Sequence, residues 1–95
     1  MSIRSKLTRW HLTFSGKVQH VGFRYTASYL ARELYITGWV RNRDDGSVEM
    51  EAQAPVSLLR SFLIRLKALP NVHIEQTSIE EIQPVIADRH FRILF

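Results

Sequence analysis

The sequence predicts a two-layer α+β fold in which two helices pack on one face of an antiparallel sheet. Two observations support this prediction. The hydrophobic period along the chain follows the order strand, helix, strand, strand, helix, strand, with a short extra strand at the C-terminal end. Each helical segment also carries a single apolar stripe, and a shared sheet face buries two such stripes together.

The predicted elements follow from the spacing of apolar residues and from turn residues between them. Alternation predicts strands, a repeat of three or four residues predicts helices, and Asp45-Gly46 is typical of a hairpin turn. The expected elements are a strand over 8–17, a helix over 23–35, strands over 39–42 and 47–54, a helix over 55–69, a strand of uncertain extent within 72–82 and a terminal strand over 90–95.

Individual residues justify the ends of these elements. Trp10, Leu12 and Phe14 share one side of the first strand, and Gly16 interrupts it. Pro55 is suited to the first position of the second helix, and Pro70 ends that helix. The βαββαβ order with two helices on one face is the ferredoxin-like arrangement.

Length and composition limit the classes of function. The 95 residues are expected to form a single domain over 1–95. The absence of cysteine excludes disulfides, thiolate nucleophiles, zinc ribbons and iron–sulfur clusters. A net charge of +4 favours an anionic partner, either nucleic acid, anionic lipid or a small phosphate compound. No apolar run is long enough for a signal peptide or membrane span, so we expect a soluble, cytoplasmic protein.

The junction between the first strand and the first helix is a candidate phosphate site. Backbone N–H groups at a helix start lack intrahelical acceptors, and the helix dipole places partial positive charge there. Such a site suits a phosphate. Glycines at 16 and 22 allow the sharp backbone course that would turn these groups toward one point. The amides expected to take part are those of Gln19, His20, Val21, Gly22, Phe23 and Arg24.

Arg24 is an unusual residue for the first turn of a helix. A cation at this end opposes the dipole and costs about 0.3–1 kcal/mol when exposed. One explanation is an anion bound between the Arg24 guanidinium and the loop amides. The alternative is a structural ion pair with Glu49, Glu51 or the chain terminus, or a solvated side chain.

Three motifs at matching separations resemble those of the acylphosphatase family. They are Gly16-x-Val18-Gln19-x-Val21-Gly22-Phe23-Arg24, then Gly38-Trp39-Val40-Arg41-Asn42, then Asp45-Gly46-x-Val48-Glu49. Separated motifs at the expected spacing are far more specific than a lone glycine pattern. The resemblance implies a small enzyme without metal or other cofactor that hydrolyses the carboxyl-phosphate anhydride of acyl phosphates.

The resemblance also implies roles for particular residues. The loop over 19–24 would hold the phosphoryl group with its amides, Arg24 would bind it through the side chain, and Asn42 would position the attacking water. An amide does not accept a proton at neutral pH, so Asn42 orients the water and is no general base. The expected ligands are an acyl phosphate and inorganic phosphate, with no nucleic acid or membrane partner, and the expected form is a monomer.

His20 departs from the family pattern, which usually has glycine in the middle of the loop. If this position has positive φ, histidine is among the residues that tolerate it with some strain. If φ is ordinary, the imidazole points into solvent or over the pocket mouth. We favour a tolerated substitution over a phosphohistidine intermediate, because no flanking carboxylate orients the ring.

Two other functions remain as alternatives. One is a phosphate-binding domain of the acylphosphatase type without catalysis. The other is an RNA-binding module on the same topology, although Phe23 at a helix start does not form the aromatic platform of a central strand. His11, His73 and His90 show no metal-ligand spacing, and no recognisable element reads the acyl group.

Overall fold

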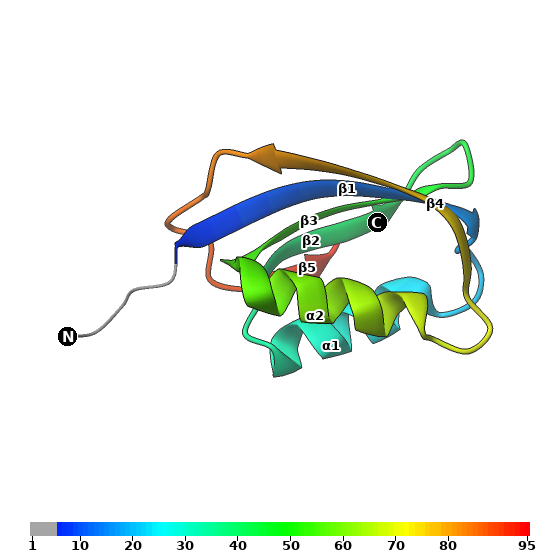
Figure 1. The fold of residues 1–95 in the computed structure, drawn as a ribbon. Helices are drawn as coiled ribbons and strands as arrows, with labels where there is room; N and C mark the ends of the chain where they lie inside the picture. Colours follow the sequence, from blue (N-terminus) through cyan, green and yellow to red (C-terminus); the bar gives the residue numbers. More distant parts are fainter. Residues whose placement is uncertain (1–5) are drawn as a thin grey trace.

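A five-stranded sheet and two helices make up the computed structural model, which describes residues 6–95. The elements are β1 (Leu7–Lys17), α1 (Phe23–Glu33), β2 (Thr37–Asn42), β3 (Val48–Pro55), α2 (Val56–Lys67), β4 (His73–Ile82) and β5 (Phe91–Ile93) (Figure 1). This is the predicted βαββαβ order with a short extra strand. The first residues of the basic N-terminal segment, 1–5, lie outside the described residues.

The sheet is mixed: its four longer strands are antiparallel, as predicted, and the short extra strand is parallel to its neighbour. Its strand order is β4-β1-β3-β2-β5. Four strands pair antiparallel, whereas β5 pairs parallel with β2. β4 ends opposite Arg9, near the start of β1, and β5 begins opposite Gly38, near the start of β2. Because the connection 83–90 stays at this end of the sheet, β5 runs parallel to β2.

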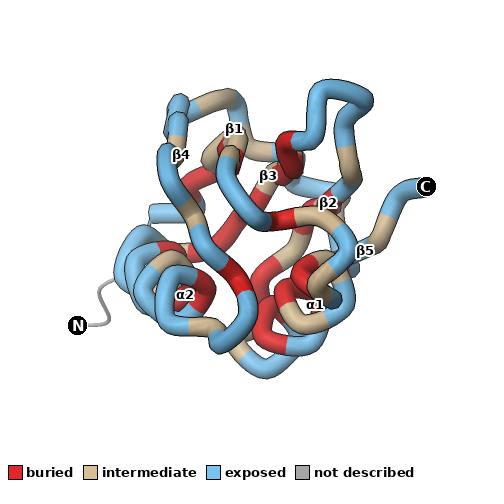
Figure 2. The backbone as a smooth tube through the Cα atoms, turned by 90° about the vertical axis from the view of Figure 1, so that its right-hand side faces the viewer, coloured by how far each residue is buried: buried red, intermediate tan, exposed pale blue. Residues whose placement is uncertain are grey.

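Both helices cover one face of the sheet, as predicted (Figure 1). Leu12 and Phe14 of β1 are buried against them, and Figure 2 shows the buried sides of α1 and α2 turned toward the strands. The Phe14 and Phe23 rings meet edge to face at 5.4 Å, which joins β1 to the first turn of α1. Within residues 6–95, neither helix has the length and apolar character needed to cross a bilayer.

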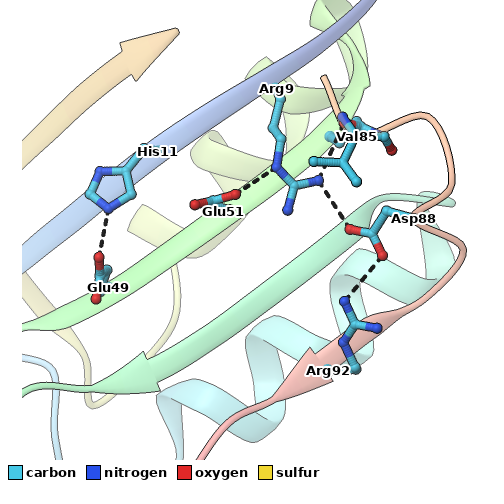
Figure 3. Close-up of polar contacts among 8 residues, drawn as sticks. Arg9, His11, Glu49, Glu51, Val85, Asp88 and Arg92 are labelled. Atoms are coloured by element: carbon cyan, nitrogen blue, oxygen red, sulfur yellow. Dashed lines mark hydrogen bonds and ion pairs between the residues drawn. The ribbon is translucent and has the colours of Figure 1, made fainter. Parts of the chain in front are cut away.

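The outer face of the sheet is covered by charged pairs (Figure 3). Arg9 donates to Glu51 at 2.6 Å and to Asp88 at 3.0 Å, so the 83–90 connection is tied to β1. His11 Nε2 donates to Glu49 at 2.7 Å. This hydrogen bond, aided by an arginine from β2 and opposed by partial burial, lowers the pKa of Glu49.

Candidate active site

The connection between β1 and α1 leaves the start of the helix open to a ligand. Gly22 caps α1 with φ 77°, no side chain caps the first turn, and that turn contains no acidic residue. The Thr26 N–H donates to the Gly22 carbonyl at 3.1 Å, which begins the helical ladder. The amides before Thr26 therefore have no acceptor in this ladder, and the dipole favours an anion beside them.

Arg24 and Asn42 lie on the same pocket, next to this helix start. The pocket has a volume of about 190 Å³ and is lined by Val18, His20, Gly22, Phe23, Arg24, Tyr25 and Asn42. Asn42 pairs with buried Val48, so its side chain is on the helix-covered face of the sheet, toward α1. Of the predicted loop residues, Gln19 and Val21 do not line the pocket.

The side-chain oxygen of Asn42 has an unusual environment. Asn42 Oδ1 is buried and has no hydrogen-bond partner among the described residues. A buried acceptor without a partner costs about 1–3 kcal/mol, and nearly all such groups in folded proteins are satisfied. Asn42 also lines the pocket, and a water or ligand donor that reached this oxygen would satisfy it.

Arg24 keeps its guanidinium N–H groups available. Among residues 6–95, no carboxylate forms an ion pair with it. The two glutamates considered as partners are bound elsewhere, Glu49 by His11 and Arg41 and Glu51 by Arg9. The Arg24 Cζ instead lies 5.1 Å from the centroid of the Phe95 ring. Stacking on a ring covers a guanidinium face and leaves its N–H edge free for an anion.

Gln19 has a role that the sequence did not reveal. Its Nε2 donates to the carbonyls of Arg43 and Ser47, both at 2.8 Å. These two residues close the turn between β2 and β3, where the Arg43 N–H donates to the Ser47 carbonyl. Figure 1 shows the β1–α1 connection and the β2–β3 turn at the same end of the sheet. The side chain thus anchors the loop beside Asn42.

The Ser47 end of this turn is stabilised by Asp45. The Asp45 carboxylate accepts hydrogen bonds from the Ser47 hydroxyl at 2.6 Å and the Ser47 N–H at 2.9 Å, and these lower the pKa of Asp45. The aspartate is therefore a turn residue, as expected for Asp before Gly in a hairpin.

His20 adopts the first of the two conformations considered for it. Its φ is 62°, in the left-handed region that favours glycine, and the residue is exposed at the pocket lining. Histidine tolerates this region better than most residues do, at some cost in strain.

The model of the Acylphosphatase family matches residues 10–93. The chain belongs to the acylphosphatase family. An acylphosphatase of Geobacillus thermodenitrificans is 39% identical over 95 residues, covering 94% of this chain and 96% of the relative. One of Pediococcus pentosaceus is 54% identical over 61 residues, covering 64% of this chain and 68% of the relative.

The fold agrees with this membership. The crystal structure of acylphosphatase from Bacillus subtilis superposes with a TM-score of 0.87 at 34% identity, covering 95% of this chain and all of that one. The protein is therefore an acylphosphatase-type hydrolase with the ferredoxin-like fold of its family, and the predicted fold and family are confirmed.

The outer sheet face gives no support to the RNA-binding alternative. RNA-binding modules of this topology stack bases on aromatic side chains of the open face. Here Trp39 is half-buried and has the Arg41 Cζ 5.6 Å from its ring, while ion pairs occupy the neighbouring strands.

In the described part of the chain, no group of three or more His, Asp or Glu could hold a metal ion.

Proposed function

We propose that this acylphosphatase-family enzyme hydrolyses acyl phosphates in the pocket between the start of α1 and the end of β2. The loop amides that border this pocket, within residues 20–24, and the Arg24 guanidinium hold the phosphoryl group, and Asn42 orients the attacking water. The observation that supports this most directly is the unpartnered, buried Oδ1 of Asn42, a residue that lines the same pocket as Arg24. A water held there would donate to Oδ1 and face a phosphorus atom bound beside Arg24.

Catalysis of this phosphoryl transfer depends mainly on electrostatic stabilisation of the transition state. The water oxygen attacks phosphorus, the bond between phosphorus and the acyl oxygen breaks, and the carboxylate leaves with the electron pair. The proton from water goes to a phosphoryl oxygen, because Asn42 is unable to accept it. Arg24 and the helix start stabilise the charge on the equatorial oxygens, so the reaction needs neither a metal ion nor another cofactor.

On this proposal the enzyme is a cytoplasmic monomer whose ligands are a small acyl phosphate and inorganic phosphate. Nucleic acid and membranes take no part. Hydrolysis of benzoyl phosphate should then be unchanged by EDTA, and inorganic phosphate should inhibit competitively.

Arg24→Ala and Asn42→Ala separate binding from catalysis. Loss of the guanidinium should lower kcat/KM by at least about 10³-fold and abolish inhibition by phosphate, because both depend on the same cation. Loss of the Asn42 amide should lower kcat by about 10²–10³-fold while the inhibition constant for phosphate stays close to that of the parent. Steady-state kinetics with benzoyl phosphate measure both effects.

Arg41→Ala is the matched control, because Arg41 adjoins Asn42 but binds Glu49 on the outer face of the sheet. Its turnover should match the parent. An Asn42→Ala enzyme with the parent rate would show that another group orients the water. Phosphate binding by the parent without turnover would establish the non-catalytic alternative.

A further inference from the structure

Two exposed aromatic side chains lie beside the candidate site without contributing to the core. Tyr25 is 61% exposed and lines the pocket. Phe95 is 92% exposed, and its ring lies against the Arg24 guanidinium. Neither ring has a part in the proposed attack on phosphorus, so their presence beside the pocket needs a different explanation.

The pocket is small, and its polar groups are those assigned to the phosphoryl group. Its volume of about 190 Å³ is below the roughly 300–1,000 Å³ of sites that enclose a drug-sized ligand. The amides and Arg24 are placed to take the phosphoryl group, so an acyl group bound with it points toward the mouth of the pocket, where the rim lies. The rim residues are therefore the part of the protein that contacts the acyl group.

The topology explains why Phe95 lies at this rim. β5 runs parallel to β2, with Ile93 opposite Val40, and the Leu94 N–H donates to the Val40 carbonyl at 2.9 Å. Two residues further along the two strands are Phe95 and Asn42. The parallel direction of β5 thus brings Phe95 to the end of the sheet where Asn42 and the phosphate loop lie.

We propose that Tyr25 and Phe95 form an aromatic rim that selects acyl phosphates with an apolar, planar acyl group. This proposal rests on the proposed function. A planar acyl group leaving the pocket packs against the ring of Tyr25 and the part of the Phe95 ring that Arg24 does not cover. An acetyl group is too short to cover either ring, so it gains little from the rim.

The ratio of kcat/KM for benzoyl phosphate to kcat/KM for acetyl phosphate tests this proposal. Burying about 50 Å² of apolar surface corresponds to an effect of about fivefold to tenfold. Tyr25→Ala and Phe95→Ala should each lower the ratio by about this factor, and Phe95→Leu by less. Tyr29→Ala is the matched control, because Tyr29 is 64% exposed one turn further along α1 and does not line the pocket. Its ratio should equal that of the parent.

The possible results distinguish a failure of the aromatic-rim proposal from a failure of the proposed function. Equal losses on both substrates would overturn the proposal, because they would mean that the two rings act only by positioning Arg24. An unchanged ratio would overturn it as well. If the parent hydrolyses neither substrate, the proposed function fails, and calorimetric binding then tests the rim alone. Benzoyl phosphate should still bind more tightly than acetyl phosphate to the parent, and Tyr25→Ala and Phe95→Ala should each reduce the difference.

Discussion

The side chain of Gln19 fixes the distance between two parts of the candidate site that are far apart in sequence. It belongs to the loop that precedes α1, yet both of its hydrogen bonds go to carbonyls of the β2–β3 turn. Arg43, one of these partners, directly follows Asn42. Movement of this side chain would therefore change where the water-orienting amide lies relative to the loop, and a misplacement of about 1 Å is costly in catalysis.

Gln19→Ala should lower kcat for benzoyl phosphate by about tenfold to a hundredfold, with a smaller effect on inhibition by phosphate, because the loop amides and Arg24 remain. Gln19→Glu should lower kcat at least as much, since a carboxylate has no N–H to donate to the two carbonyls and is repelled by their oxygens. Gln76→Ala on the exposed β4 strand serves as the control. A Gln19→Glu enzyme with parental kcat would show that the two hydrogen bonds do not position the site.

Sequence patterns singled out candidate residues with distinctive local chemistry, but they did not reveal the side-chain role of Gln19, which depends on the fold. Arg24 could be singled out because a cation at a helix start opposes the dipole, and Asn42 because of its motif. The side-chain role of Gln19 depends on the approach of a loop to a turn that begins 24 residues later in the chain. The conformation of His20 could not be decided either, since the residue type permits positive φ without requiring it.

At the level of the elements, the period of apolar residues predicted the long strands and both helices. The predictions were less definite for β4 and β5. β4 is an edge strand whose residues are mostly exposed on both faces, so its sequence lacks a clear alternation. β5 has only three residues, and alternation indicates a strand without telling whether its partner is parallel.

Gly16 determines how β1 leads into the phosphate loop. The pairing of β1 with β4 shifts between Ser15 and Gly16, and Gly16 has φ 116°. A Cβ at this position would overlap the carbonyl oxygen of His73, which is part of the backbone. Alanine therefore requires β1 and β4 to separate at the bulge.

Gly16→Ala should lower the free energy of unfolding by about 3 kcal/mol, since it combines a disfavoured φ with a backbone clash. Gly46→Ala is the control, because Gly46 has φ 92° but open space around a Cβ. It should lose only the conformational part, about 1–2 kcal/mol. Urea unfolding monitored by tryptophan fluorescence measures both, and equal losses would mean that the bulge accommodates a side chain.

For the molecule as a whole, an ion pair on the outer face of the sheet links the first strand to the connection between the last two strands. Arg9 and Asp88 are 79 positions apart and each only 3% exposed, so this ion pair is buried beneath the 83–90 connection. In the sequence, Arg9 occupies an alternating strand position that normally faces water. Its burial could not be foreseen because it depends on where the 83–90 connection crosses the sheet.

The two arginines that bind Asp88 offer a test of how this long-range pair stabilises the fold. Arg9 is 3% exposed, whereas Arg92 is 54% exposed and pairs with the same carboxylate at 3.2 Å. Arg9→Met leaves Asp88 and Glu51 without their buried cation, and removal of one partner from a buried pair costs about 3–5 kcal/mol. Arg92→Met should cost at most about 1 kcal/mol, because an exposed pair gains little from its Coulomb attraction.

Urea unfolding of the two variants checks this difference, and equal losses would contradict it. The Arg9 variant should also show faster amide hydrogen exchange in β5 than the parent, because the connection that Arg9 anchors leads directly into that strand. β5 in turn carries Phe95 to the pocket, so the same variant should lose part of the preference for benzoyl phosphate under conditions where it remains folded. A variant with weakened β5 and an unchanged preference would mean that Phe95 keeps its place through Arg24 alone.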